Sequence, residues 1–263
     1  MPAATLWHSK TITNANTAQG AGVQPFIWLH GWGHDCQALS RMADLFKGCG
    51  KHTLYDLPGF GETPPLAEGA DTRKYADALA RQLSKVPGGT KSAIFIGHSY
   101  GGRVAVQLAA HYPEMVKAII LISGAGLKRK RPVTFKVRAL SLKLLGRAAR
   151  LCDAVFGTHY RDAYIKNFGS SDYQKAGALR GTLVSAVNED LTHIAQQIKC
   201  PTLLVYGADD TETPPEIGRR YESLIPIARF ELLKGYGHND ILTRGAYQCE
   251  ALIKTFLKDL GDD

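Results

Sequence analysis

The sequence predicts an α/β fold, in which helices cover both faces of a doubly wound, mostly parallel sheet and a helical insertion interrupts the order. Short, largely apolar segments, typical of buried parallel strands, alternate with helical segments at 25–29, 93–96, 117–122, 201–206 and 228–233. Glycine-rich loops follow several of these runs, where such folds place their functional side chains. A chain of 263 residues with 44% hydrophobic content is long enough to bury one sizeable core.

The segment Gly97-His98-Ser99-Tyr100-Gly101 lies between the apolar run 93–96 and the helical stretch 103–111. A Gly-x-Ser-x-Gly between a strand and a helix predicts a sharp turn that exposes the serine hydroxyl at the carboxyl end of the sheet. The two glycines lack a Cβ that would collide with the neighbouring strand and helix. The helix N-terminus favours negative charge at the same place, so Ser99 is the candidate nucleophile.

A serine nucleophile needs a base, and the base needs an acid that orients it. The run 201–206 leads into Gly207-Ala-Asp209-Asp210, which puts an acid at the tip of a strand. The last run leads into Gly237-His238. Among the nine histidines, only His238 follows both the Ser99 turn (the nucleophile elbow, 97–101) and the acid in the sequence. Asp209 and Asp210 both remain candidates for the acid at this point.

The segment Asp56-Leu-Pro-Gly-Phe-Gly61 resembles the one that α/β-hydrolases carry after their second core parallel strand, which implies a strand at 51–55, and His30-Gly31-Trp32-Gly33 follows the run 25–29. With these motifs the chain resembles the α/β-hydrolase superfamily over nearly its whole length. The resemblance implies a serine, acid, histidine order and a Gly-x-x-Asp pattern that favours Asp210 over Asp209. It also implies that the backbone N–H groups of Trp32 and Tyr100 form the oxyanion hole.

Within that superfamily, the motifs at 30–33 and 56–61 are similar to those of the pimeloyl-carrier-protein methyl ester esterases. The elbow departs from their pattern, because His98 stands where those esterases typically carry tryptophan. The resemblance implies a serine carboxylesterase that forms an acyl-enzyme on a small-molecule ester and uses no metal or other cofactor. A thioesterase, a C–C bond hydrolase and a non-enzymatic receptor or scaffold on the same fold are the alternatives.

Further residues are expected around the substrate. His30 is expected to bond loop backbone rather than act as a base, Gly31 lies in the oxyanion loop, and His98 is expected to support the catalytic residues. Tyr164 and Phe168, with Tyr160 and Tyr173, are candidates for the roof of the pocket. Packing between helices is an equally good interpretation of these four aromatic residues.

The helical insertion at 125–188 is expected to form a cap that divides the hydrolase core into 1–124 and 189–263. Residues 124–190 hold 13 basic and 5 acidic side chains, whereas the rest of the chain holds 19 of each, so the formal charge of +8 lies entirely on this segment. Three interpretations follow: a solvated surface, recognition of an acidic acyl carrier or anionic substrate, or contact with an anionic membrane. Nucleic acid is not expected, because the sequence carries no fold that recognises it.

The five cysteines are odd in number and scattered, so they predict neither a disulfide framework nor a zinc site. No apolar leader opens the sequence, and no apolar run approaches the ~18 residues that a membrane span needs. A cytoplasmic protein is therefore expected.

Overall fold

The computed structural model describes residues 6–14, 23–86, 90, 92–129, 133–160 and 176–261. The centre is a seven-stranded sheet in the order β1-β3-β2-β4-β5-β6-β7. The strands are β1 (Ser9–Ile12), β2 (Pro25–Leu29), β3 (Lys51–Tyr55), β4 (Ala93–His98), β5 (Val116–Ile122), β6 (Thr202–Gly207) and β7 (Ala228–Leu233). All pairings are parallel except that of β1 with β3, which confirms the predicted mostly parallel α/β sheet.

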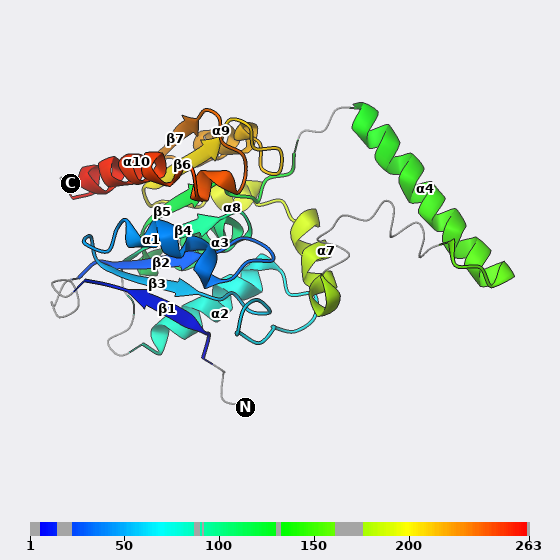
Figure 1. Ribbon diagram of the computed structural model, residues 1–263, viewed down its shortest axis with the longest axis horizontal. Coiled ribbons are helices and arrows are strands. Elements are labelled where there is room, and N and C mark those ends of the chain that lie inside the picture. Colours follow the sequence, from blue (N-terminus) through cyan, green and yellow to red (C-terminus); the bar gives the residue numbers. More distant parts are fainter. Residues whose placement is uncertain are drawn as a thin grey trace.

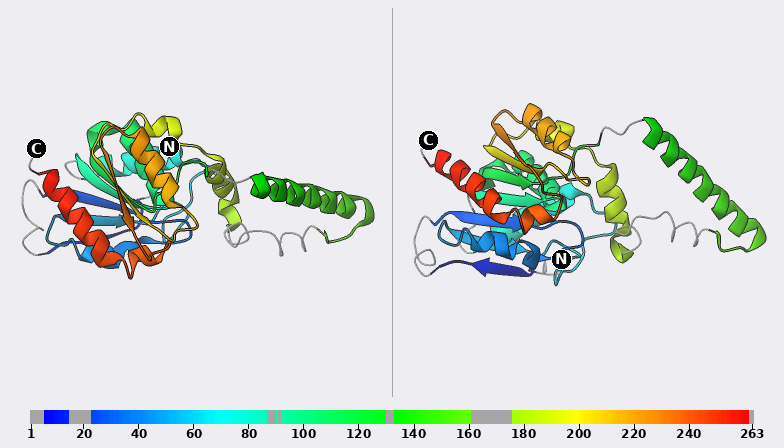
Figure 2. Two further views of the ribbon diagram at one scale, coloured as in Figure 1. Left: turned by 90° about the horizontal axis from the view of Figure 1, so that it is seen from above. Right: turned by 45° about the horizontal axis from the view of Figure 1, so that its top comes forward.

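Helices cover both faces of this sheet (Figures 1 and 2). The α-helices are α1 (Ser40–Asp44), α2 (Thr72–Ser84), α3 (Tyr100–His111), α4 (Val133–Phe156), α7 (Arg180–Asn188), α8 (Thr192–Ala195), α9 (Pro215–Leu224) and α10 (Ala246–Asp259). The 3-10 turns are η1 (Cys36–Leu39), η2 (Pro113–Met115), η3 (Gly177–Leu179) and η4 (Asp240–Leu242). Buried side chains of α2, α3, α8 and α9 share one core cluster, and those of α1 and α10 share the other.

The strands form where they do because their side chains alternate between two apolar cores. Ile27 and Leu29 of β2 belong to the core on the α3 side, whereas Phe26 and Trp28 belong to the core on the α10 side. All six residues of β4 are buried, as a strand with helices on both faces requires. The edge strand β1 was not predicted, because its sequence Ser-Lys-Thr-Ile lacks a continuous apolar run.

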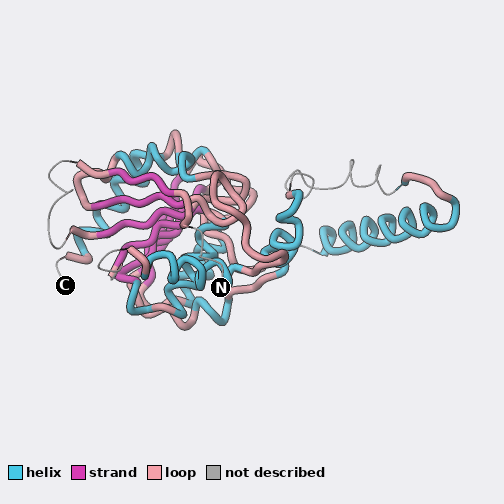
Figure 3. The backbone as a smooth tube through the Cα atoms, turned by 90° about the horizontal axis from the view of Figure 1, so that it is seen from below, coloured by secondary structure: helices cyan, strands magenta, loops and turns pink. Residues whose placement is uncertain are grey.

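The two α-helices described within the insertion differ in how they meet the core. Thr182 and Ala186 of α7 are buried, and Leu179, just before it, packs on the core. Helix α4 lies apart from the rest of the molecule in every view (Figures 1–3). Among the described residues, no helix is long and apolar enough to cross a membrane.

Candidate active site

Ser99 occupies a strained turn between β4 and α3. Its backbone has φ 50° and ψ −110°, a region that residues other than glycine rarely adopt. A Cβ at Gly97 would lie 2.6 Å from the carbonyl oxygen of Gly101, and a Cβ at Gly101 would lie 2.1 Å from the Leu29 carbonyl oxygen. Both neighbours must therefore be glycine, and the turn presents a half-buried Ser99 at the N-terminus of α3.

The loops after β6 and β7 bring an acid and a histidine together. The Nδ1 atom of His238 lies 2.8 Å from Oδ2 of Asp210, and both side chains are buried. Asp209 is exposed, and its backbone N–H donates to the Tyr236 carbonyl oxygen. The structure therefore pairs His238 with Asp210 and turns Asp209 outward.

Four donors surround the Asp210 carboxylate. The backbone N–H groups of Glu212 and Thr213 each lie 2.8 Å from Oδ1, while the Thr213 hydroxyl and His238 bind Oδ2. Burial raises the pKa of Asp210, but the hydrogen bonds from His238 and Thr213 outweigh burial and hold that pKa below its usual value. Asp210 is therefore an ionised acceptor that fixes its histidine.

Thr213 is a site residue that the sequence analysis missed. Its Oγ1 atom lies 2.9 Å from Asp210 Oδ2, 3.1 Å from His238 Nδ1 and 2.9 Å from the Ser123 carbonyl oxygen, so it joins the acid, the base and the end of β5. Aspartate side chains commonly form turns in which they accept from backbone N–H groups two and three residues further on. The spacing of Asp210 and Thr213 was the signal that could have placed Thr213 in the site.

Besides Asp210 and Thr213, the His238 side chain contacts Glu212 and His98. Its Nε2 atom lies 3.6 Å from Oε2 of the exposed Glu212, and its ring centroid lies 4.8 Å from that of His98. Asp240, by contrast, accepts from the Gly237 N–H and pairs with Arg244. No hydrogen bond joins Ser99 to His238 among the residues that the structure describes.

The loop after β2 packs against the nucleophile turn. A Cβ at Gly31 would lie 3.3 Å from the Ser99 Cβ, so the loop and the serine are in close contact. In the described part of the chain, the backbone N–H groups of Trp32 and Tyr100 donate to no protein acceptor. Their rings meet edge to face, with centroids 5.4 Å apart, and Tyr100 is buried.

His30 and His98 are buried histidines beside the site. The Nδ1 atom of His30 lies 2.7 Å from the Gly31 carbonyl oxygen, and its Nε2 accepts from the Leu57 N–H at 3.0 Å, so both nitrogens bind backbone. The Nδ1 atom of His98 lies 3.0 Å from the Ile122 carbonyl oxygen. Burial and the neighbouring His238 lower the pKa of His98 to about 3, so this ring is neutral.

Of the four aromatic residues predicted for the pocket roof, the structure describes Tyr160. Tyr164, Phe168 and Tyr173 lie outside the described residues, and Tyr160, beyond α4, is 59% exposed. A cavity of about 460 Å³ has Glu212 and Thr213 in its wall, but Ser99, Asp210 and His238 do not line it.

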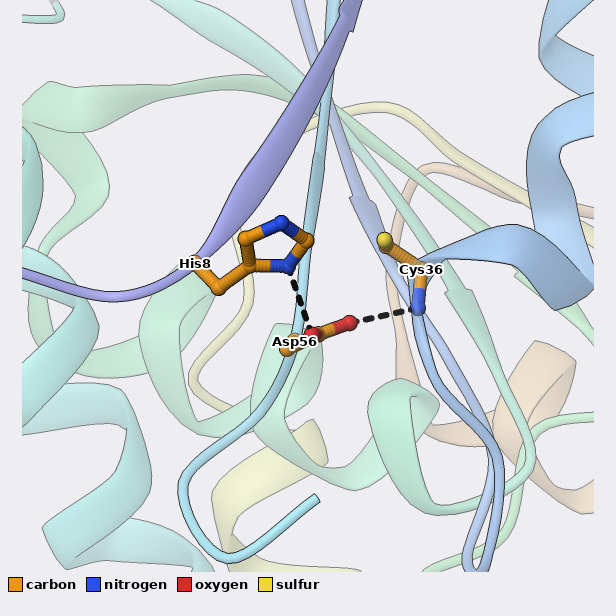
Figure 4. A group of neighbouring side chains, drawn as sticks. All are labelled: His8, Cys36 and Asp56. Carbon is orange, nitrogen blue, oxygen red and sulfur yellow. Dashed lines mark hydrogen bonds and ion pairs between the residues drawn. The ribbon is translucent and has the colours of Figure 1, made fainter. Parts of the chain in front are cut away.

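A second polar cluster is formed by His8 just before β1, Cys36 at the start of η1 and Asp56 just after β3 (Figure 4). The Asp56 carboxylate accepts from His8 Nδ1 at 2.7 Å and from the backbone N–H groups of Cys36 and Glu62 at 2.7 and 2.9 Å. Nitrogen and oxygen ligands around tetrahedral zinc stand about 3.4 Å apart, so the contact between His8 and Asp56 is too close for two ligands. The cluster does not fit a metal and serves to tie three chain segments together.

Comparisons with known proteins show what the chain is similar to. The chain is 27% identical, over 92% of its length and 79% of the other protein, to a pimeloyl-[acyl-carrier protein] methyl ester esterase of Neisseria meningitidis serogroup A. It is also 27% identical to Lipase 1 of Psychrobacter immobilis, over 89% of this chain and 77% of that protein.

Among solved structures, a putative lipase from Acinetobacter baumannii superposes with a TM-score of 0.72 at 19% identity, over 97% of this chain and 88% of that one. A likeness at this identity shows the shared fold. A family model described as the alpha/beta hydrolase fold matches residues 24–245. The chain belongs to the alpha/beta hydrolase family, and its curated relatives include esterases and lipases.

Proposed function

We propose that this protein is a serine hydrolase that cleaves a carboxylic ester through an acyl-enzyme. The observation that carries the proposal is the buried pair of Asp210 and His238, 2.8 Å apart, beside a serine held in a strained turn at a helix N-terminus. These are the parts that nucleophilic acyl transfer requires.

In this mechanism the Ser99 hydroxyl attacks the ester carbonyl while His238 takes its proton through Nε2. Asp210 accepts the Nδ1–H and stabilises the imidazolium, which then protonates the leaving alkoxide. The N–H groups of Trp32 and Tyr100, which have no acceptor among the described residues, stabilise the oxyanion. Water then attacks the acyl-enzyme with His238 as the base, and Ser99 is released.

The absence of a hydrogen bond between Ser99 and His238 is compatible with this mechanism. Catalytic hydrogen bonds are often long in free enzymes and tighten only when substrate binds. The two side chains come from adjoining turns, and His98 contacts the His238 ring from the position directly before Ser99. Movement of these side chains on substrate binding would complete the proton path.

Relatives named as methyl ester esterases and as a lipase favour an oxygen ester as the substrate. A C–C bond hydrolase also occurs among them, named 2-hydroxy-6-oxononadienedioate/2-hydroxy-6-oxononatrienedioate hydrolase, at 24% identity. Thioester and C–C substrates use the same serine, acid and histidine. They are therefore alternatives that a substrate panel separates.

The test is the hydrolysis of p-nitrophenyl esters from acetyl to dodecanoyl by the wild type and by the Ser99→Ala variant. We expect turnover by the wild type, loss of at least about a thousandfold in kcat for the variant, and labelling of Ser99 by a fluorophosphonate. Ser223→Ala, an exposed serine on α9, is the matched control and should retain full activity.

Turnover that survives in Ser99→Ala would exclude Ser99 as the nucleophile. Tight binding of esters without turnover would instead favour a receptor on this fold. A thioester and a C–C substrate assayed in parallel show which acyl bond the pocket prefers.

A further inference from the structure

Helix α4 presents an apolar surface that the core does not cover. Leu144, Leu151 and Val155 recur at spacings of seven and four residues, so they stack along one face of the helix. Their side chains are more than half exposed, and Phe156 is 75% exposed. Figures 1–3 show α4 lying clear of the sheet and its helices.

The same helix carries most of its charge as cations. The segment 133–156 holds five basic residues and one acid. The exposed Arg147 and Arg150 fall on the face that adjoins the apolar stripe, about 40–100° around the helix axis from it. The one acid, Asp153, accepts from the Thr158 hydroxyl and the Tyr160 N–H in the turn after the helix.

We propose that α4 docks this protein on an anionic lipid bilayer. A helix that exposes leucine, valine and phenylalanine next to arginines, as α4 does with Arg147 and Arg150, is suited to lie in the membrane interface. Its apolar face then lies among the acyl chains and its cations among the headgroups. Arginine side chains reach the phosphate level while their stems cover apolar surface. The docking is independent of the proposed chemistry at Ser99.

Charge and apolar exposure together favour a bilayer over the other occupants. A second copy of the chain would bring two helices of net positive charge together, which opposes a dimer through α4. An acidic carrier protein would neutralise Arg147 and Arg150 but would leave Leu151 and Phe156 in water. An anionic bilayer satisfies both faces of the helix.

The test is cosedimentation of the full-length protein with vesicles of phosphatidylglycerol and phosphatidylcholine, against vesicles of phosphatidylcholine alone. We expect binding that requires phosphatidylglycerol and weakens as salt rises. Arg147→Gln with Arg150→Gln should lower the partition coefficient about 30-fold. Leu151→Ser with Phe156→Ser should lower it by more than about tenfold.

Two pairs of substitutions away from α4 are the matched controls, and both should bind like the wild type. Ile227→Ser with Tyr247→Ser removes exposed apolar side chains, and Lys234→Gln with Lys258→Gln removes exposed cations. The Ser99→Ala protein should also bind unchanged, so a failure of the proposed chemistry leaves this test intact. Circular dichroism confirms that each variant is folded.

Binding that is absent at low salt, or that is equal for the two lipid compositions, would overturn the proposal. So would binding of an acyl carrier protein, without vesicle binding, that the Arg147 and Arg150 substitutions abolish. A dimer that the Leu151 and Phe156 substitutions dissociate, again without vesicle binding, would also overturn it.

Discussion

At the scale of single residues, Thr213 connects the acid to the rest of the site. Its hydroxyl has one proton and three oxygen or nitrogen neighbours, which belong to Asp210, His238 and Ser123. A group that contacts both members of an acid–base pair holds them at one separation. Thr213 is therefore a positioning residue for the proposed reaction and takes no proton from substrate.

Thr213→Val removes this hydroxyl and leaves the backbone N–H that binds Asp210 in place. A hydrogen bond to a charged group contributes about 1.5–3 kcal/mol, so we expect kcat to fall about tenfold to a hundredfold with KM little changed. Steady-state kinetics on a p-nitrophenyl ester measures both constants. Thr213→Ser keeps a hydroxyl at this position and should retain most of the wild-type kcat. A kcat of Thr213→Val equal to that of the wild type would exclude the positioning role.

At the scale of elements, close backbone contact fixes the elbow where β4 meets α3. Gly101→Ala places a Cβ 2.1 Å from the Leu29 carbonyl oxygen, and backbone atoms cannot move aside as a flexible side chain can. We expect a loss of at least about 3 kcal/mol in unfolding free energy, measured by urea denaturation. In Gly48→Ala, the control, the nearest atom would be 3.8 Å away, so its stability should match the wild type.

The segments just before β1, at the start of η1 and just after β3 are joined through the carboxylate of Asp56. Burial raises the pKa of Asp56, but backbone donors at Glu62 and Cys36 and the His8 side chain outweigh it, so the folded-state pKa is lowered. A lowered pKa means that this stabilisation is fully present above the unfolded value, about 3.9, and is lost as pH falls through the folded value.

Asp56→Asn should therefore destabilise the protein at pH 7, by about 2–3 kcal/mol, because the neutral amide keeps one weaker acceptor. The difference from the wild type should begin to shrink below about pH 4, where the carboxyl of the unfolded wild type takes up a proton, and should vanish only below the lowered folded-state pKa of Asp56. Thermal unfolding of both proteins between pH 3 and pH 7 measures this. A difference that stays constant over that range would show that the charge of Asp56 is not what stabilises the strand ends.

The sequence predicted the parts of the fold that depend on local pattern. The apolar segments became strands, most clearly β4, β5 and β6, because a strand buried on both faces needs a continuous apolar sequence; the strand at 51–55, β3, followed from the family resemblance. The residues alone left the partner of His238 open between Asp209 and Asp210, since adjacent residues on one loop differ only in which way they face, and the family pattern favoured Asp210. Thr213 was missed because its role depends on contacts with Ser123 and His238, which are distant in sequence.

At the scale of the whole molecule, the stability of the core does not depend on the middle of the insertion. Every buried apolar side chain among the described residues lies outside 130–175, and neither core cluster includes a residue of α4. Leu127 and Ala186, near the ends of the insertion, are buried in the core on the α3 side. The core therefore anchors both ends of the insertion without depending on its middle.

Replacing residues 130–175 with a Gly/Ser linker of about 20 residues should leave a folded core. Because no described apolar contact of the core is lost and loop-closure entropy changes slowly with length, we expect the free energy of unfolding to change by less than about 2 kcal/mol, or about 4–8 °C in Tm. Calorimetry measures this change, and the same protein should bind anionic vesicles no better than phosphatidylcholine vesicles.

Turnover of p-nitrophenyl acetate should persist, because Ser99, Asp210 and His238 all lie outside the excised segment. Failure of the shortened protein to unfold cooperatively would show that the insertion is part of the folding unit, and the division into core and cap would then be wrong.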